Sequence, residues 1–223
     1  MTPASFVQAL AGIRLPNVFN PYAEQCAVHD RANASALRRR ALRTYLEAVA
    51  ALGSDTIWMG RDLGYRGGRR TGLALTDELH LPAFGRVYPG SDVAKATHGA
   101  IIAERTAAEI WGVLEQLDVP PLLWNVFPFH PHDPDQPFTN RKFTTQELRT
   151  VDELNGELVQ MLRIRRIIAI GQDAAGYATQ FGAPVEAVRH PSYGGVVEFR
   201  AGICRLYRLA RIAPRSAAQS ALF

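Results

Sequence analysis

Three short polar segments of the chain carry side chains that could do chemistry together. The first runs from Gly60 to Gly72 and combines five glycines, which let a backbone approach a ligand closely, with the carboxylate of Asp62. The second presents the amide of Asn125, and the third is a turn that begins at His190. A carboxylate can orient water, an amide offers a donor and an acceptor to the edge of a base, and an imidazole can donate a hydrogen bond. These residue types favour a site that recognises a base and activates water.

Each of these segments directly follows a predicted strand. Short apolar runs bounded by turn residues predict four buried strands, at residues 56–59, 121–127, 167–170 and 185–188. Helices are expected over about 34–52, 91–117, 144–164, 173–181 and 196–206. This alternation predicts an α/β fold, a single-domain layered α-β-α arrangement with a central, mostly parallel four-stranded sheet. Ligands bind beyond the carboxyl ends of such strands, so the three segments should meet there.

The length and composition are those of a folded chain. With 223 residues we expect one domain over residues 1–213 and a flexible tail at 214–223. Hydrophobic residues make up 47% and charged residues 21%, which excludes disordered and collagen-like classes. No apolar run approaches a membrane span and no secretory signal is visible, so we expect a cytoplasmic protein. Two cysteines, Cys26 and Cys204, are too few for a disulfide framework or a four-cysteine iron–sulfur cluster.

The charge of the chain is carried mostly by arginine. The formal net charge is +4, and of 25 basic residues two are lysines, Lys95 and Lys142, which leaves 23 arginines. A guanidinium can bind two phosphate oxygens at once, so an arginine-rich surface is consistent with a nucleic-acid partner. Nucleotide bias in a genome produces the same composition, so composition alone leaves both explanations open.

The order of the three motifs resembles the uracil-DNA glycosylase superfamily. Gly-x-Asp-x-Gly after the first strand, an asparagine after the second and His-Pro-Ser after the last are similar to that family over about residues 56–199. The spaced glycines that end in Thr71-Gly72 are most similar to the single-strand-selective type, whereas Asp62 resembles the aspartate of the Gly-Gln-Asp-Pro-Tyr type. With only two cysteines, the chain is similar to the members that have no iron–sulfur cluster.

The resemblance implies a monofunctional uracil-DNA glycosylase of base excision repair. Such an enzyme flips uracil out of DNA, hydrolyses its N-glycosidic bond and leaves an abasic site. Asp62 corresponds to the water-orienting aspartate and His190 to the histidine that binds the uracil O2, so these are the expected catalytic residues. The reaction builds positive charge on the sugar and negative charge on the base, which a carboxylate and a donor stabilise. The resemblance implies no cofactor and no metal, and we expect a monomer acting on single- or double-stranded DNA.

The same resemblance implies which residues surround the base. An amide at Asn125 that accepts from N3–H and donates to O4 would discriminate against cytosine. Gly64 stands where a tyrosine bars a 5-methyl group in the Gly-Gln-Asp-Pro-Tyr type, so the exclusion of thymine is open, with the neighbouring Tyr65 as an alternative. Leu75 stands where relatives stack a phenylalanine on the base. The implied substrate-binding set is Gly60, Arg61, Gly64, Tyr65, Leu75 and Asn125.

Contacts to the DNA backbone are expected around the first and last loops. The arginines of the first loop could grip the deformed phosphodiester chain, although a solvated loop would have the same sequence. Relatives place a large residue two positions after the serine to fill the gap left by the flipped base. That position is Gly194 here, which makes Tyr193 the candidate wedge. The implied DNA-binding set is Arg66, Arg69, Arg70, Ser192, Tyr193 and Gly194.

Two other functions stay open on the sequence alone. His130, His132 and Asp133 could hold a metal ion and make the protein a metal-dependent hydrolase. The departures from the family pattern also allow a protein that binds damaged or uracil-containing DNA without cleaving it. The segment Gly171-Gln172-Asp173 repeats letters of the first loop, but it precedes a helix, so we interpret Asp173 as an N-cap.

Overall fold

Four parallel strands form the centre of the protein. The structure is a computed structural model that describes residues 1–210, so the tail expected at 214–223 lies outside the described residues. The strands pair in the order β3-β2-β5-β6, which confirms the predicted α/β fold. Their bounds are β2 Thr56–Asp62, β3 Leu122–Phe127, β5 Arg166–Ile170 and β6 Val185–Val188. A separate antiparallel pair, β1 Val18–Phe19 and β4 His130–Pro131, ties the N-terminal segment to the loop after β3.

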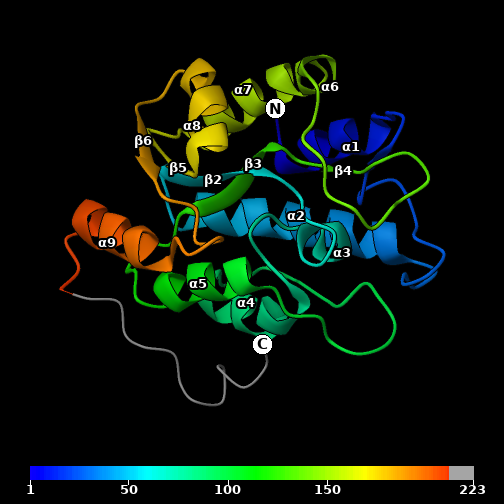
Figure 1. The fold of residues 1–223 in the computed structure, drawn as a ribbon, viewed down its shortest axis with the longest axis horizontal. Helices are drawn as coiled ribbons and strands as arrows, with labels where there is room; N and C mark the ends of the chain where they lie inside the picture. The colour runs from blue at the N-terminus through cyan, green and yellow to red at the C-terminus, as the bar shows by residue number, and fades with distance from the viewer. Residues whose placement is uncertain (211–223) are drawn as a thin grey trace.

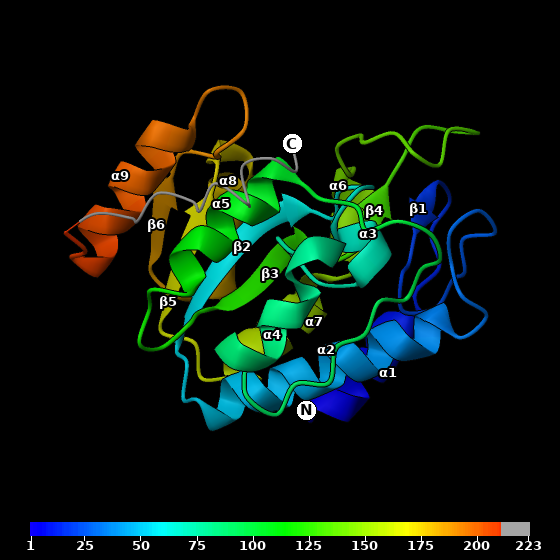
Figure 2. The same ribbon diagram turned by 90° about the horizontal axis from the view of Figure 1, so that it is seen from below.

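Helices cover both faces of the sheet. In Figure 1, α6, α7 and α8 lie above the strands and α4, α5 and α9 lie below them. In Figure 2, seen from below, α5 lies in front of the sheet and α9 lies beside β6. The helices are α1 Pro3–Gly12, α2 Ala34–Ala51, α3 Gly68–Thr71, α4 Leu81–Val87, α5 Arg105–Leu114, α6 Thr145–Arg149, α7 Asp152–Met161, α8 Gln172–Ala178 and α9 Val196–Tyr207, with 3-10 turns at Glu78–His80 and Thr179–Phe181. Over the described residues, no helix is both long and apolar enough to pass through a bilayer.

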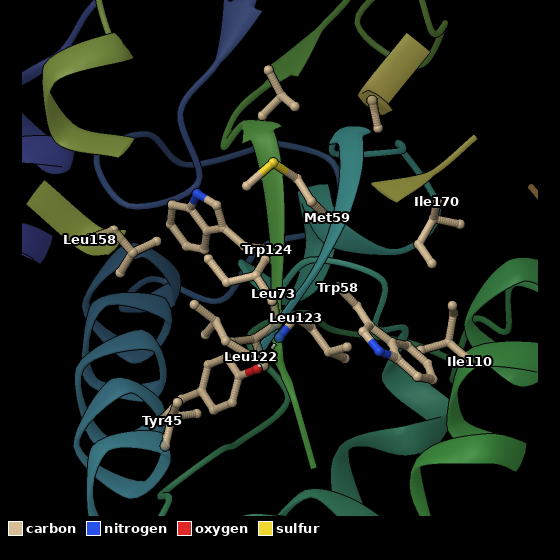
Figure 3. Packing of buried hydrophobic residues seen from close by; sticks show 14 of the residues in the cluster. Tyr45, Trp58, Met59, Leu73, Ile110, Leu122, Leu123, Trp124, Leu158 and Ile170 are labelled. Atoms are coloured by element: carbon tan, nitrogen blue, oxygen red, sulfur yellow. Dashed lines mark hydrogen bonds between the residues drawn. The ribbon is translucent and has the colours of Figure 1, made fainter. Parts of the chain in front are cut away.

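Large apolar side chains fill the space between the sheet and each helical layer (Figure 3). Trp58 of β2 is fully buried toward α9, where its indole N–H donates to the Tyr207 hydroxyl at 2.8 Å. Trp124 of β3 points to the opposite layer and donates to the Asn155 side-chain oxygen of α7 at 2.9 Å. Because these strands are buried on both faces, they carry the continuous apolar runs that predicted them.

The outer edge of β3 is covered by side chains. The Tyr45 hydroxyl of α2 accepts a hydrogen bond from the Leu123 backbone amide at 2.6 Å (Figure 3). Tyr45 packs edge-on against Tyr88, with the ring centroids 4.8 Å apart, and the Tyr88 hydroxyl donates to the Pro121 carbonyl at 2.7 Å. Side-chain hydroxyls therefore satisfy backbone groups that another strand would otherwise pair.

Two predicted helices differ from the structure, whereas α2 lies where it was expected. Residues 91–104 form an irregular segment, so the predicted helix over 91–117 is wrong in its first half. Two buried carboxylates hold this segment extended, because Asp77 accepts the Glu104 amide at 2.6 Å and Glu78 accepts the Ile102 amide at 3.0 Å. The predicted helix over 144–164 begins with the expected capping box but is divided into α6 and α7.

The interpretation of Asp173 as an N-cap is also wrong. Helix α8 starts one residue earlier than predicted, at Gln172, and Gly171 occupies the cap position with a φ of +94°. Asp173 therefore lies inside the first helical turn, and its carboxylate is available to side chains of other segments.

Candidate active site

The carboxyl ends of β2 and β3 bring a glycine and an amide into direct contact. Gly60 and Asn125 are paired neighbours in the sheet, and a Cβ atom at position 60 would collide with Asn125 Oδ1. The same atom would lie 3.1 Å from a methyl group of Leu75, whose φ of +53° is rare for a residue with a side chain. Gly60, Leu75 and Asn125, three residues of the predicted base-binding set, therefore converge.

Asn125 carries an unused hydrogen-bonding group. Its side chain is 1% exposed, and none of the described residues donates a hydrogen bond to its buried Oδ1 atom. Buried polar atoms of this kind are normally paired, since leaving one unpaired costs about 1–3 kcal/mol. A ligand-recognising amide requires an acceptor that the protein itself leaves unpaired despite this cost, next to a backbone lined by glycine.

Asp62, at the end of β2, lies in a network of alternating charges. Arg61 Nε donates to Asp62 Oδ2 at 2.6 Å, and Arg61 Nη1 donates to Asp173 Oδ2 at 3.0 Å. Lys142 also pairs with Asp173, at 2.9 Å. Burial raises the pKa of Asp62 above its ordinary value, and the Arg61 guanidinium opposes that effect. The network keeps a largely buried carboxylate beside fixed cations at the mouth of the site.

His190 is held in one tautomer. The Ser192 backbone amide donates to His190 Nδ1 at 3.1 Å, and the Ser192 hydroxyl lies 2.7 Å from the same nitrogen. Burial lowers the pKa of His190, with the Arg61 and Arg189 guanidinium groups adding to the effect. The ring is therefore neutral at pH 7 with Nδ1 as an acceptor, which leaves the proton on Nε2.

The last loop, which begins at His190, carries a solvent-exposed aromatic side chain. Tyr193 is 97% exposed and has a φ of +52°, and Gly194 follows with a φ of +79°. Two consecutive left-handed residues form a tight tip that turns Tyr193 outward, away from the protein. This geometry is compatible with the predicted wedge.

The arginines of the first loop divide into one surface residue and two buried ones. Arg66 is exposed, with its Nε donating to the Tyr65 hydroxyl at 2.9 Å. Arg69 is 5% exposed and lies over the Phe19 ring, 3.8 Å from its centroid. Arg70 is 8% exposed and forms an ion pair with Glu78 at 3.0 Å. Arg69 and Arg70 thus make their contacts in the interior, and Arg66 is the arginine of the three that faces solvent; that Arg69 and Arg70 contact DNA stays a prediction.

The metal-site hypothesis is also wrong for His130. The side chain is fully buried, Arg69 Nη1 lies 3.1 Å from its Nδ1, and the Thr139 carbonyl lies 2.8 Å from its Nε2. Burial, assisted by Arg69, lowers its pKa to about 3. Both ring nitrogens are occupied by protein groups, and no cluster of three or more potential metal-binding side chains occurs among the described residues.

Three residues at the site had no clear signal in the sequence. Asp173 and Lys142 join the network around Arg61, and Glu104 comes from the irregular segment that was predicted as helix. A Cβ atom at Gly64 would lie 3.5 Å from Glu104 Oε1, and one at Gly67 would collide with Oε2. Only the pairing of residues far apart in the chain brings these groups to the first loop.

Comparisons with known proteins bear on the fold. No protein-family profile matches the chain, and no curated protein sequence matches it. Among solved structures the chain is similar to the crystal structure of wild-type SMUG2 from Pedobacter heparinus, a member of the uracil-DNA glycosylase superfamily. The TM-score is 0.54 at 14% identity, over 93% of this chain and 94% of that chain. At this identity the likeness concerns the fold alone, and the chain shares the layered α/β fold of that structure.

Proposed function

We propose that this protein is a DNA repair glycosylase that flips uracil out of DNA and hydrolyses its N-glycosidic bond. The observation that carries the proposal is the buried Oδ1 of Asn125, to which none of the described residues donates a hydrogen bond, at the same end of the sheet as Asp62 and His190. The likeness in fold to SMUG2 supports it, as do the motifs of the sequence.

Asn125 explains a preference for uracil over cytosine. Its Oδ1 would accept from uracil N3–H while its Nδ2 donates to O4. Cytosine presents an acceptor at N3 and a donor at its exocyclic amine, so both contacts would be repulsive. Gly60 lets the base approach the β2 backbone, and Leu75 would pack on one face of the ring.

Asp62 and His190 would act on opposite sides of the breaking bond. As the bond between C1′ and N1 breaks, its electron pair moves to the base and positive charge builds on the sugar. Ionised Asp62 would stabilise that charge, orient the water that adds to C1′ and accept the proton that this water loses. The Nε2–H of neutral His190 would donate to O2 of the departing base, whose charge it stabilises without giving up its proton. The Arg61 guanidinium favours the ionised form of Asp62 and so opposes the effect of burial, which raises the pKa of this carboxyl.

Surface groups around the site would hold the deformed DNA. Arg66 and Lys142 are exposed cations next to the first loop, and Ser192 lies in the last. The exposed Tyr193 ring would fill the gap in the base stack that the flipped nucleotide leaves. A monomer would suffice for these contacts, and no cofactor is required.

End-labelled oligonucleotides with one uracil, thymine or hypoxanthine test the proposal. We expect uracil-dependent strand breaks after alkali, unchanged by EDTA. Asp62→Asn should remove most of this activity and keep DNA binding, whereas Asp118→Asn, an exposed aspartate outside the site, should change neither. Binding in a mobility shift without any base release would instead favour the non-catalytic binder.

A further inference from the structure

Glu104 fills a recess under the first loop. Gly64 and Gly67 have no side chains, and the Glu104 carboxyl occupies the space that their Cβ atoms would face. The Thr76 carbonyl lies on the same side, 3.2 Å from the Cβ position of Gly67. The preceding residue, Leu75, packs beside Gly60 at the base-reading amide. The Leu75-Thr76 segment thus links the surroundings of Asn125 to those of Glu104.

The backbone around Glu104 is fixed by buried charges. Its amide donates to Asp77 Oδ2 at 2.6 Å, and Asp77 is fully buried. Two residues earlier, the Ile102 amide donates to Glu78, which is buried and paired with Arg70. Two buried carboxylates therefore anchor the backbone from which the Glu104 side chain extends.

The Glu104 carboxyl itself has no hydrogen-bond donor among the described residues. It lies at the N-cap of α5, but its side chain makes no capping bond. Two charged groups act on it: Asp77, which disfavours the ionised form, and Arg66, which favours it. Burial, reinforced by Asp77, raises its pKa to about 7. The absence of a donor among the described residues sets this carboxyl apart from the neighbouring Asp77 and Glu78, which both accept backbone amides.

We infer that Glu104 is a specificity-determining residue whose carboxyl forms the wall of the base pocket beside Gly64 and excludes the 5-methyl group of thymine. The inference rests on the proposed function, since it names a determinant within that site. Asn125 would grip the N3 and O4 edge of the base, and C5 is the ring atom next to the carbon that bears O4. In this proposed binding mode the C5 side of the base faces Gly64 and the Glu104 carboxyl beside it. A methyl group there would displace solvent from a carboxyl and offer it no hydrogen bond.

Tyr65 is the competing candidate for this role. Its hydroxyl accepts from Arg66 Nε at 2.9 Å, and the Arg66 guanidinium lies over its ring, 5.6 Å from the centroid. Tyr65 is therefore engaged with a surface cation and leaves the recess beside Gly64 to Glu104.

The test compares thymine with uracil release, measured as kcat/KM on otherwise identical single-stranded oligonucleotides. One methyl group in a pocket changes selectivity by about 10–200-fold, so Glu104→Ala should raise the thymine-to-uracil ratio at least about tenfold. Glu104→Ser should do the same while keeping a good N-cap for α5. Tyr65→Ala and Glu153→Ala, an exposed glutamate of α7, should leave the ratio unchanged. Uracil release in each variant reports that it is folded.

The outcomes separate the two proposals. If the wild-type protein releases uracil but neither Glu104 variant raises the ratio, the inference on Glu104 is overturned and the glycosylase remains. A rise of the thymine-to-uracil ratio in Tyr65→Ala alone would assign the role to Tyr65 and would also overturn the inference on Glu104. If the wild-type protein releases no uracil at all, the proposed function itself fails.

Discussion

Replacing Asn125 should make the protein more stable and less active at once. The side chain is 1% exposed, and its buried Oδ1 has no donor among the described residues. An unpaired buried acceptor costs about 1–3 kcal/mol, and Asn125→Val removes it while introducing a residue well suited to a strand. We expect unfolding free energy to rise by about 1 kcal/mol, which for a chain of this size raises Tm by about 2–4 °C.

The same substitution removes the two hydrogen bonds through which the amide would bind uracil. At about 1.5 kcal/mol for each, uracil release measured as kcat/KM should fall at least about a hundredfold. Thermal and guanidinium unfolding measure the first effect, and the oligonucleotide assay measures the second.

Asn155 supplies the matched control. It is also a buried asparagine, but it accepts from the Trp124 indole at 2.9 Å and donates to the Val126 carbonyl at 2.8 Å. Asn155→Leu should therefore lower unfolding free energy by about 2–4 kcal/mol, because two buried partners lose their bonds. If Asn125→Val destabilised the protein as much as Asn155→Leu does, Oδ1 would be satisfied in the free protein, and the reasoning that makes it a recognition group would be refuted.

Three further predictions concern charge. Asp62→Asn should lower uracil release by about 10²–10⁴-fold with little change in DNA affinity in a mobility shift, and full activity would move the catalytic role elsewhere. Burial raises the pKa of Glu104 from its ordinary value of 4.5 to about 7, so the folded state holds the proton more tightly than the unfolded state does. Stability should therefore fall as pH rises from 5 to 8, by up to about 3 kcal/mol. Glu104→Gln should lose that slope in guanidinium titrations, and an unchanged slope would contradict the assignment. Arg66→Ala should reduce the salt dependence of DNA binding by about one phosphate contact, whereas Arg70→Ala should lower stability and leave the salt dependence as it is; the reverse pattern would show that Arg70 reaches DNA.

Local patterns were sufficient to predict the strand ends and the residues on them. Asp62, Asn125 and His190 each follow a short apolar run, and in a parallel sheet such positions meet at one edge. The glycine at position 60 was part of a visible motif, and its close approach to Asn125 follows from the pairing of neighbouring strands.

The residues that prediction missed depend on contacts between distant parts of the chain. In the sequence, Arg69 and Arg70 look like surface cations. In the structure Arg70 pairs with Glu78, and the ring of Phe19 covers the Arg69 guanidinium. Glu104 was expected on a helix because Ser91 could cap one that runs through Leu117. The buried Asp77 and Glu78 carboxylates bind the backbone of that segment instead, and no local signal reports such a bond.

The Tyr45 hydroxyl at the edge of β3 bears on the tendency of this protein to aggregate in solution. A parallel sheet ends in a strand whose free amides and carbonyls can recruit a strand from another molecule, and such recruitment starts aggregation. Here Tyr45 occupies the Leu123 amide and α2 screens that border. The β3 edge is thereby protected against pairing with another molecule, so the strand ends that carry the predicted site residues can stay polar without a template for assembly on this edge.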